Sequence, residues 1–143
     1  MNVKMMLSLK GRNVTTIEPH ATLEAAVALL AKHRIGALVV LGAEERVIGI
    51  LSERDIVRVL SERGAHVLEE PVNDVMTRKV VSCRQSDTVA GIMEMMTLGK
   101  FRHLPVVEDG KVVGLISIGD IVKRRVQEYE TEQEALQNYI KTA

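Results

Sequence analysis

Two similar stretches decide the fold of this chain: Gly49-Ile50-Leu51-Ser52-Glu53-Arg54-Asp55-Ile56-Val57 and Gly114-Leu115-Ile116-Ser117-Ile118-Gly119-Asp120-Ile121-Val122. Each begins with a short apolar run, which is typical of a buried β-strand. Each continues with Ser-x-x-Asp, a pattern typical of the first turn of a helix, because both side chains can accept hydrogen bonds from free backbone N–H groups. The same strand-to-helix junction therefore occurs twice in one chain.

The similarity extends upstream of both junctions. Val14-Thr15-Thr16-Ile17 aligns with Val80-Val81-Ser82-Cys83, and Thr22 aligns with Thr88. Each of these two threonines precedes apolar residues at helical spacing, so we predict that both cap an amphipathic helix. Self-similarity of this extent indicates an internal repeat.

The middle of each copy predicts a pair of strands. Apolar runs lie at 37–41 and 47–51 in the first copy, and at 103–107 and 112–116 in the second. Asp109-Gly110, between the second pair of runs, is a strong signal for a tight hairpin turn. Each copy is therefore predicted to be a strand, a helix, two strands and a second helix, in that order.

Composition limits the classes of function. The 143 residues carry 19 basic and 19 acidic side chains, which argues against general binding to nucleic acid or to an anionic membrane. Three aromatic residues are too few for a stacking platform, and one cysteine, Cys83, allows no internal disulfide. No apolar run approaches the roughly 20 residues of a membrane span, and the N-terminus lacks a signal-peptide pattern. We expect a cytoplasmic protein.

With its motifs in the same order twice, the chain resembles a pair of CBS domains, a tandem known as a Bateman module. The resemblance assigns one CBS repeat to residues 8–66, a second to residues 72–126 and a helical tail to residues 127–143. It implies an α/β (α+β) fold of two pseudo-twofold-related β-α-β-β-α repeats packed sheet to sheet. It also implies two clefts of a kind that commonly binds AMP, ATP, NAD or NADH, or S-adenosylmethionine.

The Ser-x-x-Asp junctions have two interpretations. A helix N-terminus attracts phosphate, and a carboxylate such as Asp55 or Asp120 can accept both hydroxyls of a ribose. The same residues also form an ordinary capping box, which is the commoner use of the pattern. The residues alone favour the cap, the resemblance favours the nucleotide, and the two roles are compatible.

The resemblance also implies which residues share a cleft. The segment leading into one repeat should face the Ser-x-x-Asp of the other, so Thr16 would join Ser117 and Asp120, and Ser82 would join Ser52 and Asp55. Residues 35–37 and 101–103 would contact adenine, partly through the backbone. The full set of predicted nucleotide-binding residues is Thr16, Ile35, Gly36, Ala37, Ser52, Arg54, Asp55, Ser82, Arg102, His103, Pro105, Ser117 and Asp120.

Basic residues gather near these positions, and arginine suits phosphate because its planar group gives two parallel hydrogen bonds. They are Arg34, Arg54, Arg58, Lys100, Arg102, Lys123 and Arg124. Half or more of them are expected to be ordinary solvated helix ends. Glu53-Arg54 corresponds to Ile118-Gly119 in the second copy, so the two clefts should differ.

These observations predict a regulator and not an enzyme. No metal-ligand spacing, phosphate-binding glycine loop or catalytic set is visible, and Cys83 aligns with a buried strand position. We expect adenine-nucleotide binding, a homodimer formed through apolar helix faces such as Ile56-Val57 and Ile121-Val122, and an unidentified effector protein. The alternative is a constitutive dimerisation or scaffold module whose clefts hold no physiological ligand.

Overall fold

The computed structural model describes residues 1–142, so Ala143, the last residue of the predicted tail, lies outside the described residues. The first repeat consists of β1 (Thr16–Ile17), α2 (Leu23–His33), β2 (Ala37–Leu41), β3 (Val47–Ser52) and α3 (Glu53–Arg63). The second consists of α4 (Val89–Gly99), β4 (His103–Glu108), β5 (Lys111–Ser117) and α5 (Ile118–Thr142). Further helices, absent from the sequence prediction, are α1 (Val3–Lys10) and the 3-10 helices η1 (Ala43–Glu45), η2 (Ala65–Glu69) and η3 (Val72–Asp74).

The predicted helix starts and hairpin turn are confirmed. The hydroxyls of Thr22 and Thr88 each accept a hydrogen bond from the backbone N–H three residues later, at 3.1 and 3.0 Å. Asp109 and Gly110 have φ angles of 53° and 79°, the left-handed pair that a two-residue turn between β4 and β5 requires. These features depend only on neighbours in the chain, which is why the sequence predicts them.

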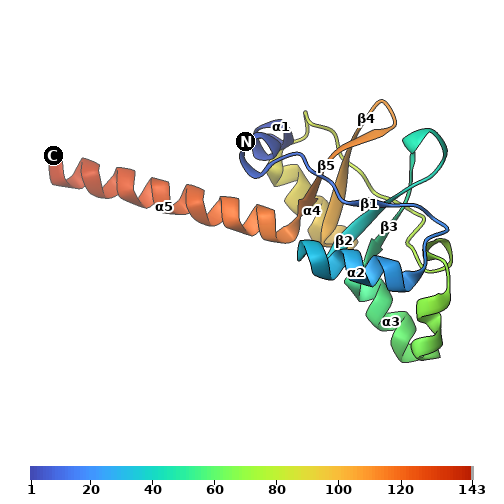
Figure 1. Ribbon diagram of the computed structural model, residues 1–143. Coiled ribbons are helices and arrows are strands. Elements are labelled where there is room, and N and C mark those ends of the chain that lie inside the picture. The colour runs from blue at the N-terminus through green and yellow to red at the C-terminus, as the bar shows by residue number, and fades with distance from the viewer. Residues whose placement is uncertain (143) are drawn as a thin grey trace.

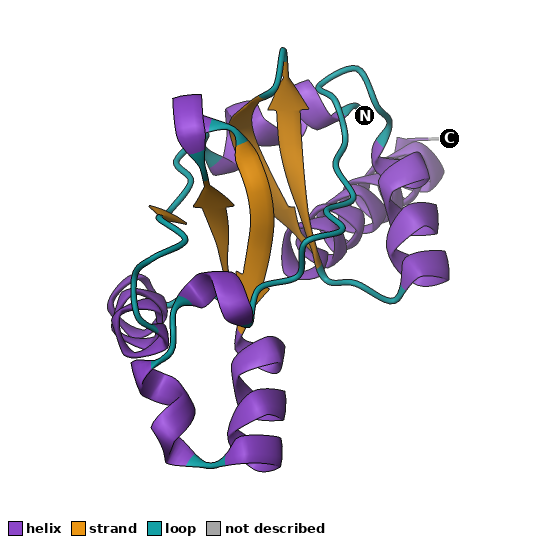
Figure 2. Ribbon diagram, turned by 90° about the vertical axis from the view of Figure 1, so that its right-hand side faces the viewer, coloured by secondary structure: helices purple, strands orange, loops and turns teal. Residues whose placement is uncertain are grey.

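Each repeat forms its own small sheet. In the first, β1 runs parallel to β2 and β2 antiparallel to β3; in the second, β4 runs antiparallel to β5. The first strand predicted for the second repeat is reduced to a single bridge, in which the Cys83 N–H donates to the Pro105 carbonyl at 3.0 Å. Figure 2 shows the strands of both repeats in the middle of the body, with the helices around them.

The core of each repeat is completed by the segment that precedes the other repeat. Helix α1 comes before the first repeat but buries Leu7 in the core of the second. Met76, in the segment that leads to α4 of the second repeat, packs in the core of the first. Glycines make room for both, because a Cβ on Gly114 would lie 2.6 Å from Leu7 and one on Gly49 would collide with Met76. The leading segments are therefore exchanged between the repeats.

The outer helix faces differ in part from the prediction. Ile56 and Ile121 were expected on an outer face but are buried in the repeat cores, whereas Val57 and Val122 are 66% and 56% exposed. Helix α5 is continuous, with no break between the second repeat and the predicted tail, and its far part projects from the body (Figure 1). Within residues 1–142, no helix is both long enough and apolar enough to cross a membrane.

Candidate functional site

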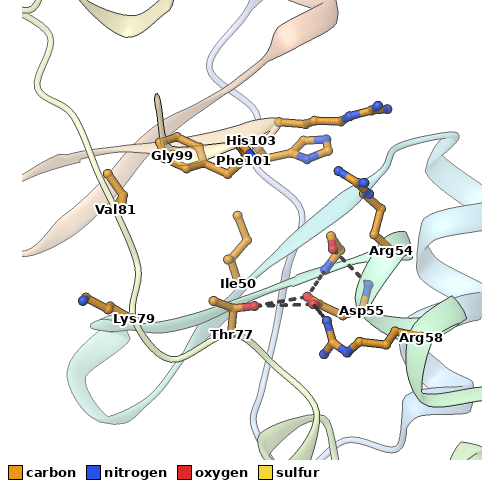
Figure 3. A pocket seen from close by; sticks show the side chains of 13 residues that line it. Ile50, Arg54, Asp55, Arg58, Thr77, Lys79, Val81, Gly99, Phe101 and His103 are labelled. Atoms are coloured by element: carbon orange, nitrogen blue, oxygen red, sulfur yellow. Dashed lines mark hydrogen bonds and ion pairs between the residues drawn. The ribbon is translucent and has the colours of Figure 1, made fainter. Parts of the chain in front are cut away.

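A pocket of about 710 Å³ lies between the two repeats, and we call it the Asp55 pocket (Figure 3). Its walls come from β3 and the start of α3, from the linker at residues 77–81, and from residues 99–103, between the end of α4 and the start of β4. The lining residues are Ile50, Ser52, Arg54, Asp55, Arg58, Thr77, Lys79, Val81, Gly99, Lys100, Phe101, Arg102 and His103. Both repeats and the linker are therefore needed to form it.

Asp55 is held rigidly at the base of this pocket. Its N–H donates to the Ser52 hydroxyl at 3.2 Å, and the Ser52 N–H donates to the Asp55 carboxylate at 3.1 Å, so the capping box is present. Arg58 pairs with Oδ1 at 3.1 Å, and the Thr77 hydroxyl donates to Oδ2 at 3.4 Å. Asp55 is only 6% exposed, and these partners stabilise its charge in that position.

The rest of the polar wall is cationic. Asp55 is the one carboxylate among the described lining residues, against five basic side chains: Arg54, Arg58, Lys79, Lys100 and Arg102. Burial lowers the pKa of His103 below its usual value, although Glu53 and Asp120 oppose the shift. His103 is therefore neutral near pH 7 and can exchange hydrogen bonds without adding charge. Such a wall suits a ligand that carries phosphate.

An apolar strip runs across the pocket between these polar groups. Ile50 and Val81 lie between the Asp55 side and Phe101, which comes from the opposite repeat (Figure 3). The Phe101 ring covers Gly99 so closely that a Cβ there would collide with it. A flat apolar group could pack in this strip while its polar substituents reach Asp55 and the cations.

Asp120 has the same local structure and a different partner. The Ser117 N–H donates to its carboxylate at 2.9 Å, and the Asp120 N–H donates to the Ser117 hydroxyl at 3.1 Å. Lys10, at the end of α1, bonds the same carboxylate at 2.5 Å and the Leu115 carbonyl at 2.6 Å. Burial opposes ionisation of Asp120, yet the hydrogen bonds from Lys10 and Ser117 and the Lys10 charge hold its pKa below the usual value.

The hollow beside Asp120 is also smaller than the Asp55 pocket. It measures about 260 Å³ and is lined by Met6, Leu9, Lys10, Asp120, Lys123, Arg124 and Gln127. Four of these residues belong to α5 and three to α1. The Lys10 ammonium thus bonds Oδ2 of Asp120, one of the two carboxylate oxygens that a ribose could use.

The structure brings together five of the predicted site residues and separates the others. Ser52, Arg54, Asp55, Arg102 and His103 line the Asp55 pocket. The expected place of Ser82 in this pocket is wrong: Val81 lines it, and Ser82 lines two hollows elsewhere. Neighbouring side chains on extended backbone point to opposite faces, so a shift of one residue changes the face.

The remaining predicted residues lie in other surroundings. Thr16 pairs with Val39 in the sheet. Lys10 lies beside Asp120, where Thr16 was expected. Ile35 and Gly36 line a separate hollow between α2 and α3. Ala37 and Pro105 are buried within β2 and β4.

Sequence reasoning missed the partners of the two aspartates. Thr77, which bonds Asp55, comes from the linker and Lys10, which bonds Asp120, from α1, both outside the stretches that were aligned. Extending the repeat alignment upstream from Val14 and Val80 places Thr77 opposite Gly11, next to Lys10. This correspondence could have indicated that the segments around Lys10 and Thr77 reach equivalent places beside the two aspartates.

Comparison with known proteins agrees with this architecture. A family model described as CBS domain matches residues 8–62 and 72–127. The crystal structure of the CBS-domain containing protein ATU1752 from Agrobacterium tumefaciens is similar, with a TM-score of 0.84 and 45% identity, covering 87% of this chain and 92% of that one. A structure of CBSX2 in complex with AMP has a TM-score of 0.71 and 25% identity, covering 82% and 90%.

A curated relative gives a longer comparison. The mitochondrial CBS domain-containing protein CBSX3 of Arabidopsis thaliana is 35% identical over 123 residues, which cover 83% of this chain. The matched region spans only 60% of the length of that relative. The similarity therefore concerns the paired repeats and not the whole of the plant protein.

Proposed function

The chain belongs to the CBS-domain family, and we propose that it is a regulatory module that binds an adenosine-containing nucleotide in the Asp55 pocket. The observation that carries the proposal is one pocket that combines a single buried carboxylate, five basic side chains and an apolar strip. The carboxylate suits the ribose hydroxyls, the basic side chains suit phosphate, and the apolar strip suits the adenine ring. AMP in the similar CBSX2 structure supports this class of ligand.

Each part of the pocket has a task in this proposal. Asp55 accepts hydrogen bonds from the ribose hydroxyls, and Arg58 and Thr77 hold its carboxylate in place. Arg54, in the first turn of α3, binds phosphate, and the positive end of the helix dipole favours an anion there. The base packs between Val81 and Phe101.

The proposal gives the two aspartates unequal roles. Asp120 is already bound by Lys10, and its hollow is less than half the volume of the Asp55 pocket. We therefore expect one tight nucleotide per chain. Ligand binding across both repeats would change how they pack and so signal to an effector protein.

A homodimer is part of the same proposal. Val27 and Val57 remain exposed beside an apolar hollow between α2 and α3, a surface suited to pairing with a second module. The scaffold alternative uses this surface without a ligand. A nucleotide should bind if the chain is a regulatory module and should not bind if it is only a scaffold.

The test is a thermal-shift screen of AMP, ADP, ATP, NAD, NADH and S-adenosylmethionine, followed by calorimetry. At one hundred times its dissociation constant, a ligand that binds only the folded chain stabilises it by about 2.7 kcal/mol. We expect Arg58→Ala to lose this stabilisation. Its matched control is Lys123→Ala, the corresponding residue of the second repeat, which should keep it. Flat curves for all six compounds at millimolar concentration would favour the scaffold alternative.

A further inference from the structure

The C-terminal part of α5 is a long helix whose side chains are almost all exposed to solvent. Ile121 is its one buried residue, and from Tyr129 to Thr142 every residue of the helix is exposed. Figure 1 shows this part projecting away from both repeats. Helices in proteins gain most of their stability from packing an apolar face, so a helix of this length calls for a partner.

Five exposed apolar residues of α5 recur at alternating spacings of four and three, whereas Ile118 and Tyr139 lie outside this series. They are Val122, Val126, Tyr129, Leu136 and Ile140, each between 49% and 65% exposed, and Gln133 occupies the remaining position of the series. This is the a/d pattern of a coiled coil, with Val126, Gln133 and Ile140 at a and Tyr129 and Leu136 at d. We call these six residues the α5 seam.

The α5 seam points away from the body. On the side of α5 that faces its own module, Ile121 is buried, Asp120 bonds Lys10, and Arg124 and Glu128 are half-buried. None of these belongs to the seam. The body and the seam therefore use different faces of the helix, and the seam is open to another molecule.

We propose that the α5 seam is a docking surface for a second copy of this chain, with which it forms a parallel, in-register two-stranded coiled coil over residues 122–140. β-Branched residues at a with leucine at d, as in Ile140 and Leu136, favour two parallel strands. The polar Gln133 at a would face the same residue of the second copy. A single polar residue at such a position fixes register at some cost in stability.

The flanking charges distinguish the orientation. In a parallel pair, Arg125 at g lies next to Glu130 at e of the second copy, which is an attractive contact. An antiparallel pair would instead bring e next to e and g next to g, so the contact between Arg125 and Glu130 would be lost. This contact therefore favours identical helices that run in the same direction.

The first experiment measures the dimer dissociation constant of the full chain by sedimentation equilibrium. The variant Leu136→Glu/Ile140→Glu places charges in the seam and should raise the constant at least about tenfold, because each charge would be buried between helices. The matched control Thr131→Glu/Asn138→Glu adds the same charges at exposed positions outside the seam. The control should match the wild type. A monomeric wild type, or equal constants for the two variants, overturns the proposal.

The second experiment tests direction and register by cross-linking. With oxidised glutathione, Gln133→Cys should form a disulfide-linked dimer, because in a parallel, in-register pair this position faces itself. Thr131→Cys, on the outer face, should cross-link far less. Cys83 does not compete, because it is buried and burial raises its pKa to about 12. Equal cross-linking at both positions, or none at Gln133→Cys, overturns the parallel arrangement.

Discussion

Asp55 and Asp120 occupy the same place in the two repeats, with the same reciprocal bonds to a serine, yet their surroundings differ. The difference comes from the segment that reaches each one from outside the repeat. Both carboxylates pair with a cation, but Asp55 pairs with Arg58 of its own helix and contacts Thr77 of the linker, whereas Asp120 is bound by Lys10 from α1. Duplication preserved the cap, and the leading segments left a pocket of about 710 Å³ beside Asp55 and a hollow of about 260 Å³ beside Asp120. A repeated motif is therefore not evidence of a repeated function.

The largest effect that tests this contrast is on ligand affinity. Asp55→Asn keeps the size of the side chain and removes the charged acceptor for ribose. Hydrogen bonds to a charged group contribute about 1.5–3 kcal/mol, so nucleotide affinity should fall about tenfold to a hundredfold. Asp120→Asn should leave the tight site within about twofold of the wild type. Calorimetry on both variants measures this, and equal losses would mean that the two sites are equivalent.

The next effect is on stability and concerns Lys10. Lys10→Met removes the partner of Asp120 and should cost about 1 kcal/mol of unfolding free energy, because the pair is only partly exposed. Lys4→Met, an exposed lysine on the same helix, is the matched control and should cost little. Denaturant unfolding at pH 7 distinguishes the two variants. A control that loses as much stability would assign the effect to α1 and not to the ion pair.

The same substitution has a pH signature. The pKa of Asp120 is lowered in the folded chain, so its contribution to stability is present above its unfolded value of 3.8 and is lost as pH falls through the folded value. In Lys10→Met, burial of the carboxylate is no longer opposed by the lysine, and the pKa of Asp120 should rise. NMR titration of the Asp120 carboxyl checks this. An unchanged pKa would show that Lys10 does not hold the carboxylate in solution.

The smallest effect concerns His103, which lies among charged groups from both repeats: Glu53, Asp120, Lys10 and Arg102. Burial lowers its folded pKa, so the unfolded chain binds a proton first as pH falls below 6.5. Stability should therefore decrease from pH 6.5 downward until the folded pKa is reached. His103→Gln should reduce that slope, and the exposed His20→Gln should preserve it. If stability falls equally with pH in both variants, His103 does not cause the loss of stability below pH 6.5.

Some parts of the site could be predicted from sequence and others could not. Ser52 and Asp55 were found because a capping box depends on residues three positions apart. Ser82 was misplaced because the face to which an extended residue points depends on the pairing of its strand, which involves distant residues. Lys10 and Thr77 were missed because their contacts join segments far apart in the chain.

The sequence by itself determined the local structure of this protein and its twofold repetition. Helix caps, the hairpin at Asp109-Gly110 and the two Ser-x-x-Asp junctions all follow from short-range hydrogen bonding and periodicity. Only the tertiary structure decided that α1 packs on the second repeat and that Lys10 binds one of the two corresponding aspartates. Such choices depend on which distant surfaces fit together, because burial of apolar area is non-directional and does not specify its partner in the local sequence.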